Sequence, residues 1–425
     1  MPRGWEATTL GDVADVVGGG TPRSTVKAYF DGDVPWLTPD DLSGWTGRWI
    51  ERGARNLSKE GLKSSSAKLL PRGAVLFSSR APIGYVALAA NPISTNQGFK
   101  SLVLKEGYDP LFFYYLMSTL KPAMEAVAFG ATFKEISASS TKELKVNVPP
   151  LPEQLRIADL MGAVDEQLAA YEAQIQTNRR RRSALLQELL NQDGGWEETT
   201  LGEVADTKSG STPKAGADEY WKNGTIPFLK IGDLTDGPVV EAHDYVTDKA
   251  VKDYRLKTYE PDTLLLAMYG SVGKLGLLKF PATANQAILA ITPKSDGLDM
   301  GFLFNVLLAD RSRLSRASFG GVQKNLSAAF MKDWEIPCPP LPEQLRIADL
   351  MSAVDDELDA LRDAREHTKT LRTALLQDLL SGAHRIPESY DRLLKEQAAP
   401  SGAGAEQGQE SNQAAAEGAA GSKFT

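Results

Sequence analysis

Two long stretches of the chain carry apolar residues at spacings of three and four, which is the pattern of an amphipathic helix. The first runs from Ile157 to Leu189 and the second from Ile347 to Leu379, and each is free of Gly and Pro over most of its length. Forty helical residues extend roughly 60 Å at 1.5 Å per residue, more than one ordinary domain can cover. We therefore predict that the two helices pack against each other along their apolar stripes. The alternative is that each helix lies on its own domain.

The segment before each helix has the pattern of a mixed domain. Short β-type runs, such as VLFSSR at 75–80 and AILAIT at 287–292, alternate with turns rich in Gly, Pro, Asn and Asp. Each segment also holds a helical stretch, at 109–121 and 300–312. This pattern predicts α+β globular domains.

The order of a domain followed by a long helix occurs twice in the sequence. The stretch PPLPEQLRIADLM occupies 149–161 and recurs letter for letter at 339–351. GWEATTLGDVADVVGGGTP at 4–22 likewise matches GWEETTLGEVADTKSGSTP at 195–213. A fixed period of this size indicates two copies of one large unit and excludes a short solenoid repeat.

The last segment differs from both copies, since it is rich in Ala, Gly, Gln and Glu and has no apolar period, so we predict disorder there. The predicted boundaries are a domain at 1–148, a helix at 149–194, a second domain at 195–338, a second helix at 339–385 and a disordered tail at 386–425.

Composition changes this picture little. The chain has 425 residues, a formal net charge of −8 and a single cysteine, so no disulfide framework is possible and a reducing compartment fits. The start has no apolar core of a secretory signal and no run of 18 apolar residues occurs, so we expect a cytoplasmic protein without a membrane span. A local basic patch remains compatible with the acidic total, so bulk charge neither favours nor excludes DNA.

The sequence motifs of common enzymes are absent. There is no Walker A loop, no Gly-x-Ser-x-Gly elbow and no Cys/His metal pattern. NPIS at 91–94 lacks the second Pro and the aromatic residue of an adenine methyltransferase motif, and the nuclease-like Glu143-Leu144-Lys145 is not kept in the second copy. We expect no catalytic residue, no metal and no cofactor in this chain.

The order of domain, helix headed by Pro-Leu-Pro-Glu-Gln, domain and same helix resembles the specificity subunit of type I restriction–modification systems. Both domains open with Trp-Glu-x-Thr-Thr-Leu-Gly, and FGATFKEIS at 129–137 and FGGVQKNLS at 319–327 resemble a late stretch of that family's target-recognition domains. The resemblance covers about residues 4–385. It implies an α+β protein with two target-recognition domains in a tandem pseudo-twofold repeat, separated by two long antiparallel helices that form a coiled coil.

The resemblance also implies a function and partners. Each domain would read one half of a bipartite, asymmetric site in double-stranded DNA, and the paired helices would set the spacing. Two methyltransferase subunits and two restriction subunits would complete the complex and would hold S-adenosylmethionine, ATP and Mg²⁺. Identical helix heads then serve two identical partners. The alternatives are a recognition unit of a fused or associated methyltransferase or nuclease, and a coiled-coil scaffold without DNA.

Polar residues beside turns are the candidates for contact with DNA, because base edges are read by hydrogen bonds. Each has a structural alternative: an ion pair for Arg80, turn formation for the threonines and a solvated surface for the lysines. The candidates are Thr21, Ser78, Ser79, Arg80, Thr132, Lys134, Thr212, Tyr269, Ser271, Gln323, Lys324 and Asn325.

Further expectations concern the helices and repeated polar pairs. We expect Asn96-Gln97 and Asn285-Gln286 to be hydrogen-bonded inside the protein, and Arg179–Arg182 to lie on a solvated helix face. The candidates for helix–helix or partner contact are Leu160, Val164, Leu168, Leu350, Val354 and Leu358.

Overall fold

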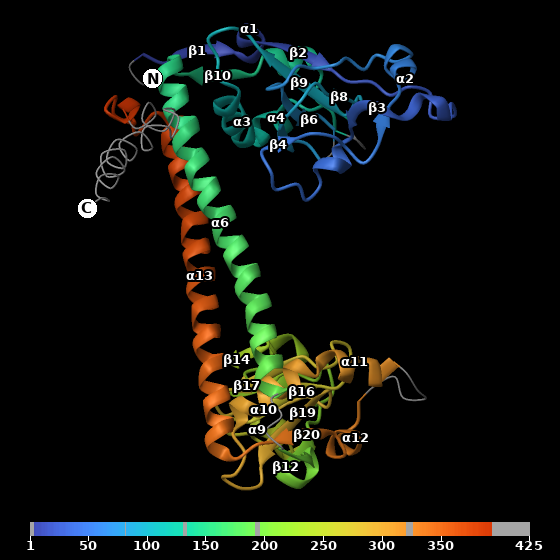
Figure 1. Ribbon diagram of the computed structural model, residues 1–425, viewed down its shortest axis with the longest axis vertical. Coiled ribbons are helices and arrows are strands. Elements are labelled where there is room, and N and C mark those ends of the chain that lie inside the picture. The colour runs from blue at the N-terminus through green and yellow to red at the C-terminus, as the bar shows by residue number, and fades with distance from the viewer. Residues whose placement is uncertain (1–3, 81, 131–133, 192–195, 320–325, 393–425) are drawn as a thin grey trace, which may run out of the picture. The chain divides into compact units, whose positions relative to one another are not determined.

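The computed structural model (Figure 1) describes residues 4–80, 82–130, 134–191, 196–319 and 326–392. The chain divides into two compact units. Unit 1 comprises residues 1–169 and 367–425, and unit 2 comprises residues 170–366. Each unit therefore holds one globular domain and parts of both long helices. The predicted fold class is confirmed.

The domain of unit 1 is built on a five-stranded sheet of order β2-β9-β6-β7-β4, a three-stranded sheet β5-β3-β8 and the pair β1-β10. Its strands are β1 Glu6–Thr9, β2 Ala14–Gly18, β3 Phe30–Leu37, β4 Trp49–Ile50, β5 Asn56–Leu57, β6 Val75–Ser78, β7 Val86–Ala89, β8 Ser94–Thr95, β9 Phe99–Leu104 and β10 Lys145–Val148. Its helices are α1 Leu10–Val13, α2 Lys59–Lys63, α3 Pro110–Thr119, α4 Lys121–Ala126 and α5 Ala138–Lys142, with 3-10 turns at Lys27–Tyr29 and Pro39–Leu42.

The domain of unit 2 repeats this topology strand for strand, with sheets β12-β19-β16-β17-β14, β15-β13-β18 and β11-β20. Its strands are β11 Glu197–Thr200, β12 Ala205–Ser209, β13 Ile226–Leu229, β14 Gly237–Val239, β15 Asp244–Val246, β16 Leu264–Ala267, β17 Leu275–Leu278, β18 Thr283–Ala284, β19 Ile288–Pro293 and β20 Glu335–Cys338. Its helices are α7 Leu201–Val204, α8 Asp218–Trp221, α9 Asp248–Tyr254, α10 Met300–Ala309, α11 Arg311–Phe319 and α12 Ala328–Lys332, with a 3-10 turn at Ile231–Asp233.

The sheet register is also repeated. In unit 1, Val75 of β6 lies opposite Leu102 of β9, and in unit 2, Leu264 of β16 lies opposite Ile291 of β19, both in antiparallel pairs. All four side chains are fully buried. The strands with continuous apolar runs are thus central in both sheets, because both of their faces are covered.

The two long helices are α6, Leu151–Leu190, and α13, Leu341–Ser381. Their heads are fixed in the same way in both copies. The Gln154 side chain donates to the carbonyl of Pro149 and accepts from the backbone of Asp109 at the start of α3, and Gln344 does the same toward Pro339 and Asp299. The Gln of the repeated Pro-Leu-Pro-Glu-Gln stretch therefore joins each long helix to its domain.

Within each unit the two long helices lie side by side in opposite directions (Figure 1). In unit 2, Arg182 contacts Asp355 whereas Glu172 contacts Arg365, so positions rise along α6 as they fall along α13. In unit 1, Ile157 and Met161 of α6 share a core with Leu376 and Leu379 of α13. The prediction that the helices pack on each other describes both units, and each helix also packs on a domain.

The segment after α13 differs from the prediction. The predicted disordered tail begins at residue 386, but Ile386 is buried in the core of unit 1 and Tyr390 donates a hydrogen bond to Asp159. An apolar and an aromatic side chain anchor this short piece, so the prediction is wrong for 386–392. The rest of the predicted tail, from residue 393, lies outside the described residues.

Candidate nucleic-acid interface

A tight turn at the end of a buried strand organises the first candidate residues. The loop between β6 and β7 closes by a hydrogen bond from the Gly84 N–H to the Ser78 carbonyl, and the Ser78 hydroxyl accepts from the Tyr85 N–H and donates to the Pro82 carbonyl. Gly84 has φ +93°, and a Cβ there would lie 3.0 Å from Cγ of Lys121. Gly273, with φ +81°, closes the corresponding turn in unit 2 onto Ala267. Both copies thus present the residues of this turn on the same frame.

A second segment lies against this turn in unit 1. The Ile136 N–H donates to the Ser79 carbonyl, and Phe129 and Glu135 exchange two backbone hydrogen bonds of 2.9 Å. Arg80 Nε donates to Glu135 Oε2 at 2.7 Å, and Lys100 Nζ lies 3.3 Å from Glu135 Oε1. The Glu135 carboxylate therefore holds two cations from two other parts of the chain.

The neighbouring charges of Arg80 and Lys100 set the protonation state of Glu135. Burial alone would raise the pKa of the Glu135 carboxyl, but hydrogen bonds from Arg80 and Lys100, together with their charges, outweigh burial and hold its pKa below the ordinary value. Glu135 is therefore ionised at neutral pH and neutralises one of the two cations. The Arg80 side chain remains 43% exposed, so its guanidinium still faces solvent.

Two further loops, at residues 20–21 and 95–98, meet beside the cluster of Arg80, Lys100 and Glu135. The Gly20 N–H donates to the Thr95 carbonyl, and the exposed Thr21 hydroxyl bonds to the exposed Gln97 side chain. Asn96 accepts from the Gly98 N–H, and Gly98 in turn accepts from the Ser79 N–H. The loops, turn and cluster are therefore continuous. The unit 1 polar edge, as named here, consists of Thr21, Arg80, Gln97, Lys100, Lys134 and Glu135.

The unit 2 polar edge has the same frame and different side chains. It consists of Thr212, Tyr269, Ser271 and Gln286. Thr212 Oγ1 lies 3.5 Å from the Gln286 backbone nitrogen, as the Thr–Gln loops again meet. Tyr269 stands where Arg80 stands in unit 1, and Leu289 of β19 stands where Lys100 stands. The charged cluster of unit 1 is thus replaced by an aromatic and an apolar side chain.

Several site predictions can be placed in the structure. Arg80, Lys134, Thr21, Thr212, Tyr269 and Ser271 lie at partly or fully exposed positions on the polar edges. Ser78 and Ser79 are fully buried, and both hydroxyls are engaged within the protein. Neither serine can reach a base edge in this structure, so we correct their role to holding the turn that carries Arg80. Thr132, Gln323, Lys324 and Asn325 lie outside the described residues.

The repeated Asn-Gln pairs correct a second prediction. Asn96 and Asn285 are half-buried and accept from the N–H two residues later, at 2.8 and 3.1 Å. Gln97 and Gln286 are exposed. The expectation of internal hydrogen bonding describes the asparagines, whereas the glutamines face outward beside the threonines.

Sequence reasoning missed Lys100, Glu135 and Phe129 of this region and gave Gln97 an internal role. Phe129 is 71% exposed and pairs through its backbone with Glu135, beside Arg80. An exposed aromatic side chain next to cations is suited to stacking on a base. The signal was the FG dipeptide, which occurs in both copies at 129–130 and 319–320.

The helix candidates fall into two groups. Leu358 is 2% exposed, and Leu160, Val164, Leu168 and Val354 are half-buried. Leu350 is 38% exposed. Of the two predicted contacts, the exposed position of Leu350 fits a partner contact better than a helix–helix contact, because Ile347 and Met351 take the buried positions on that turn. Leu350 remains available to a partner.

The arginine run corrects another expectation. Arg182 is buried, 9% exposed, and bonds to both Asp355 of α13 and Asn305 of α10. It is therefore an internal ion-pair residue. Arg179, Arg180 and Arg181 are exposed, as a solvated helix face requires.

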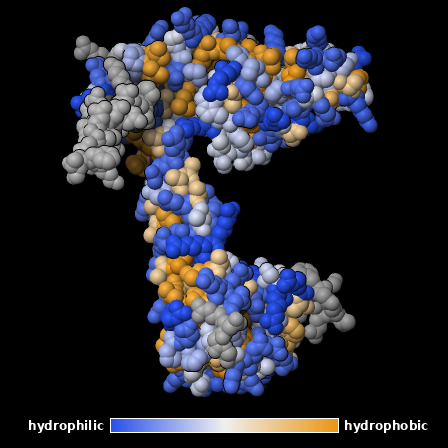
Figure 2. Space-filling view, viewed as in Figure 1, coloured by the Kyte–Doolittle hydropathy of each residue, from blue (hydrophilic) through white to orange (hydrophobic). Residues whose placement is uncertain are grey.

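Leucines also reach the surface at equivalent places on the helices. Leu155 and Leu345, in the repeated thirteen-residue stretch, are 43% and 44% exposed. Figure 2 shows hydrophobic residues at the surface along the helical segments of both units. Equal apolar positions in both copies provide two equivalent surfaces for contact with another protein.

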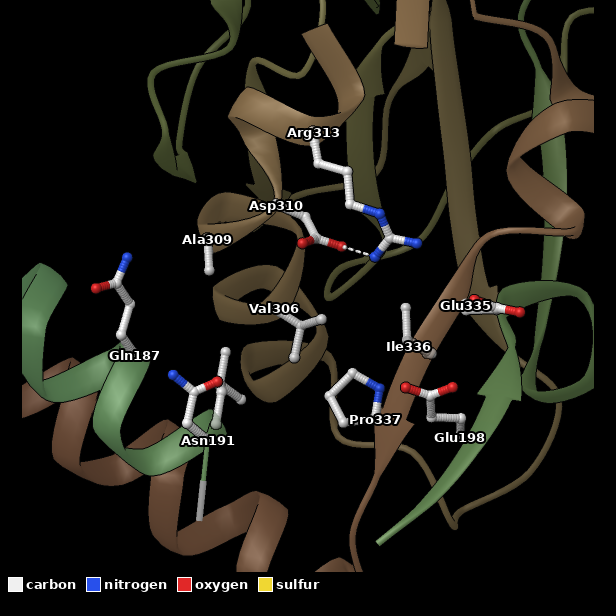
Figure 3. A pocket seen from close by; sticks show the side chains of 11 residues that line it. Gln187, Asn191, Glu198, Val306, Ala309, Asp310, Arg313, Glu335, Ile336 and Pro337 are labelled. Atoms are coloured by element: carbon white, nitrogen blue, oxygen red, sulfur yellow. Dashed lines mark hydrogen bonds and ion pairs between the residues drawn. The ribbon is translucent and has the colours of Figure 1, made fainter. Parts of the chain in front are cut away.

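A polar cavity of about 520 Å³ lies in unit 2, between the end of α6, α10 and the β11–β20 pair (Figure 3). Glu198, Glu335 and Asp310 face it, and Arg313 pairs with Asp310 and stacks over Trp334 at 4.1 Å. The Arg313 guanidinium that lines the cavity is therefore already paired with the Asp310 carboxylate. Among the described residues, no group of three His, Cys, Asp or Glu side chains is placed to hold a metal, and no helix is long and apolar enough to cross a membrane.

Comparison with known proteins now adds the family. The family described as "Type I restriction modification DNA specificity domain" matches residues 2–178 and again 193–367. The type I restriction enzyme MjaIX specificity subunit of Methanocaldococcus jannaschii is 28% identical over 420 residues, which span 91% of this chain and 95% of that protein. The EcoR124I/EcoR124II specificity subunit of Escherichia coli is 26% identical over 252 residues, 56% of this chain and 61% of that protein.

Two solved structures show the same fold at low identity. The S subunit of a type I restriction–modification system from M. genitalium aligns with a TM-score of 0.55 and 20% identity, covering 88% of this chain and 96% of its own. A chain from work on complex assembly and conformational transition of a type I R-M system aligns with a TM-score of 0.64 and 19% identity, covering 89% and 98%.

Proposed function

Because the chain belongs to the family of type I restriction–modification DNA specificity domains, with two copies of that domain, we propose that it is the DNA-recognition subunit of a type I restriction–modification complex. Unit 1 reads one half of a bipartite site in double-stranded DNA, and unit 2 reads the other. The chain itself supplies recognition, and partner subunits supply catalysis.

One observation carries this proposal: the two units share one frame and differ at the positions that face outward. Arg80, which is partly exposed in unit 1, stands where the partly exposed Tyr269 stands in unit 2. A homodimeric reader would present identical side chains to a palindrome, whereas different side chains on equivalent frames suit two different half-sites.

The residues of the polar edges suit nucleic acid. Arg80 is able to donate to a guanine edge, Gln97 and Gln286 to an adenine edge, and Lys134 to a phosphate. Thr21 and Thr212 orient the glutamine loops. The remaining candidates at 132 and 323–325 belong to the same late segment of each domain and are proposed as contacts on their sequence alone.

The helices serve as spacer and docking surface in this proposal. Half-sites one turn of DNA apart are ~34 Å between centres, and forty helical residues extend roughly 60 Å, enough to span them. Two methyltransferase subunits dock on the equivalent faces that carry Leu155 and Leu345. Two restriction subunits complete the complex, and S-adenosylmethionine, ATP and Mg²⁺ bind to the partners.

Methylome sequencing of cells that express the chain with its methyltransferase subunit tests this function. We expect a bipartite asymmetric motif. Arg80→Ala should relax one half of that motif only, and Gln286→Ala only the other half. Arg72→Ala is the control and should leave the motif unchanged. It removes an arginine of the same unit whose guanidinium already stacks over Trp49. A motif without two parts, or a change in both halves from one substitution, contradicts the proposal.

A further inference from the structure

Among the described residues, the same surface of the repeated thirteen-residue stretch is covered by another segment in unit 1 and not in unit 2. In unit 1 the segment after α13 lies across Glu153, Arg156 and Asp159 of α6. Their counterparts on α13 are Glu343, Arg346 and Asp349, within identical sequence. We call residues 385–391 the strap and the latter three residues the open face.

The strap is held by four specific contacts. Arg385 pairs with Glu153 at 3.4 Å, and Arg156 Nη1 donates to both oxygens of Asp391 at 3.0 and 3.1 Å. The Tyr390 hydroxyl donates to Asp159 at 2.7 Å. Ile386 is buried in the core of unit 1.

Covering changes the burial of the helix face. The Arg156 and Glu153 side chains are 8% and 7% exposed in unit 1. In unit 2 the Arg346 and Glu343 side chains are 46% and 27% exposed, and no other residue that the structure describes bonds to them. Trp196 is half-buried where its counterpart Trp5 is buried.

The arginine at this position has a different partner in each unit. On the open face, Arg346 turns back to Glu343 with hydrogen bonds of 2.7 and 2.8 Å. On the covered face, Arg156 instead reaches across to Asp391 of the strap. An acidic group on an occupant of the open face would therefore replace Glu343 as the partner of Arg346. The ion pair within one helix would become an ion pair between two segments.

A second copy of this chain cannot fill the open face by exchange. Each chain carries two faces and one strap, so exchanging straps between copies leaves the number of open faces unchanged. The strap of another copy therefore cannot serve as the additional occupant.

We propose that the open face in unit 2 is a docking site for a segment of a partner subunit with the chemistry of the strap: a basic residue and a buried apolar residue, followed by a tyrosine or other hydroxyl donor and an acid. This inference rests on the proposed function, since that function supplies the partner. The two units then differ at this face alone, because the strap occupies it in unit 1, whereas Leu155 and Leu345 are exposed in both units.

A synthetic, fluorescently labelled peptide of residues 382–392 tests the face without any partner or DNA. We expect saturable binding of one peptide per full-length chain by fluorescence anisotropy. Arg346→Ala should weaken it at least about tenfold. Arg362→Ala is the matched control, because Arg362 lies on the same helix, pairs with an acid three residues earlier and has a 42% exposed side chain. A peptide with Tyr390→Phe and Asp391→Asn should bind as weakly as wild-type peptide binds the Arg346→Ala chain.

The same two substitutions placed in the full chain loosen the strap and should raise the stoichiometry to two peptides per chain. Absence of peptide binding, or equal binding by the Arg346→Ala and Arg362→Ala chains, overturns the docking site.

Competition identifies the source of the natural occupant. The peptide should displace the cognate methyltransferase subunit from the wild-type chain, and Arg346→Ala should weaken that subunit's binding. If the peptide binds and the subunit is unaffected by both, the assignment to a partner is overturned, while DNA recognition, measured by the methylome, still stands or falls separately.

Discussion

Arg182 on α6 and Asp355 on α13 are joined by two hydrogen bonds, Nε to Oδ1 at 2.5 Å and Nη2 to Oδ2 at 2.7 Å. Arg372 on α13 bonds to Asp165 on α6 in unit 1, at the equivalent place with the helices exchanged. The third member is also matched, since α10 supplies Asn305 to one pair and α3 supplies Tyr115 to the other. Each unit thus contains one part-buried polar group that fixes the register of the two helices and ties them to a domain.

We expect Asp355→Asn to lower the free energy of unfolding by about 1–2 kcal/mol, because Arg182 is buried and loses a charged acceptor, while the 44% exposure of Asp355 limits the loss. Chemical denaturation measures this. Asp359→Asn, one turn along the same helix and paired with the exposed Arg362, should change stability little. Equal effects of the two substitutions would show that the buried pair adds nothing.

Leu358→Asp should disrupt unit 2 strongly, by about 3 kcal/mol or more, because it places a carboxylate at a position with 2% exposure. Leu168→Asp, at a half-buried position in unit 1, should cost less, and the two together should abolish assembly with the methyltransferase subunit. Leu371→Asp is the control, since Leu371 is 60% exposed on the same helix. Size-exclusion chromatography of the complex and thermal unfolding give the readout, and normal assembly by the double variant refutes the helix seam.

Glu135→Gln should increase the dependence of DNA binding on salt, because the cluster of Arg80 and Lys100 gains one net positive charge. Each additional phosphate contact steepens the slope of log K against log salt by about 0.9. Discrimination at the half-site read by unit 1 should fall, since the Arg80 side chain loses the carboxylate that orients it. Glu143→Gln makes the same charge change at an exposed position of the same domain. A slope shared by both variants would mean that net charge, and not the Arg80 cluster, sets the response.

Phe129→Ala should weaken DNA binding by about 1–3 kcal/mol if its exposed ring stacks on a base. Trp45→Ala, which removes another exposed aromatic side chain of unit 1, should leave the affinity unchanged. Titration of labelled duplexes that contain the target, with the methyltransferase subunit present, measures both. An unchanged affinity for Phe129→Ala excludes it from the interface.

The His243 imidazole should stabilise unit 2 in a pH-dependent way. Its hydrogen bond to the buried Asp233, 2.6 Å from Nδ1 to Oδ1, and the charge of that carboxylate raise the pKa of His243 above 6.5. The contribution is therefore present in full below the unfolded pKa and is lost as pH rises through the folded pKa. We expect His243→Ala to lower Tm more at pH 5.5 than at pH 9, with the exposed His367→Ala as control. The opposite order would exclude the ion pair as the cause.

The long helices, the central strands and the two-copy organisation were predictable from periodicity and repetition. The apolar positions that become buried in a helix or a strand can be recognised from the residues of that segment alone. The position of Leu350 was not predictable, since Ile347 and Met351 compete for the same buried turn of the helix. Ser78 and Ser79 had the polarity of a contact residue, but their hydroxyls satisfy the backbone of a turn whose closure depends on residues four to nineteen positions away. The strap was missed because its contacts join residues more than 230 positions apart.

The division of the chain into a continuous unit 2 and an interrupted unit 1 sets the order in which the cores are completed during synthesis. Residues 170–366 emerge from the ribosome as one uninterrupted stretch, so the second core has all its parts first. The first core must wait, because Leu376, Leu379 and Ile386 belong to it and are made last. A chain that is cut short after residue 366 would therefore carry a finished second half and a first half with an exposed apolar gap, which is a substrate for chaperones and proteases.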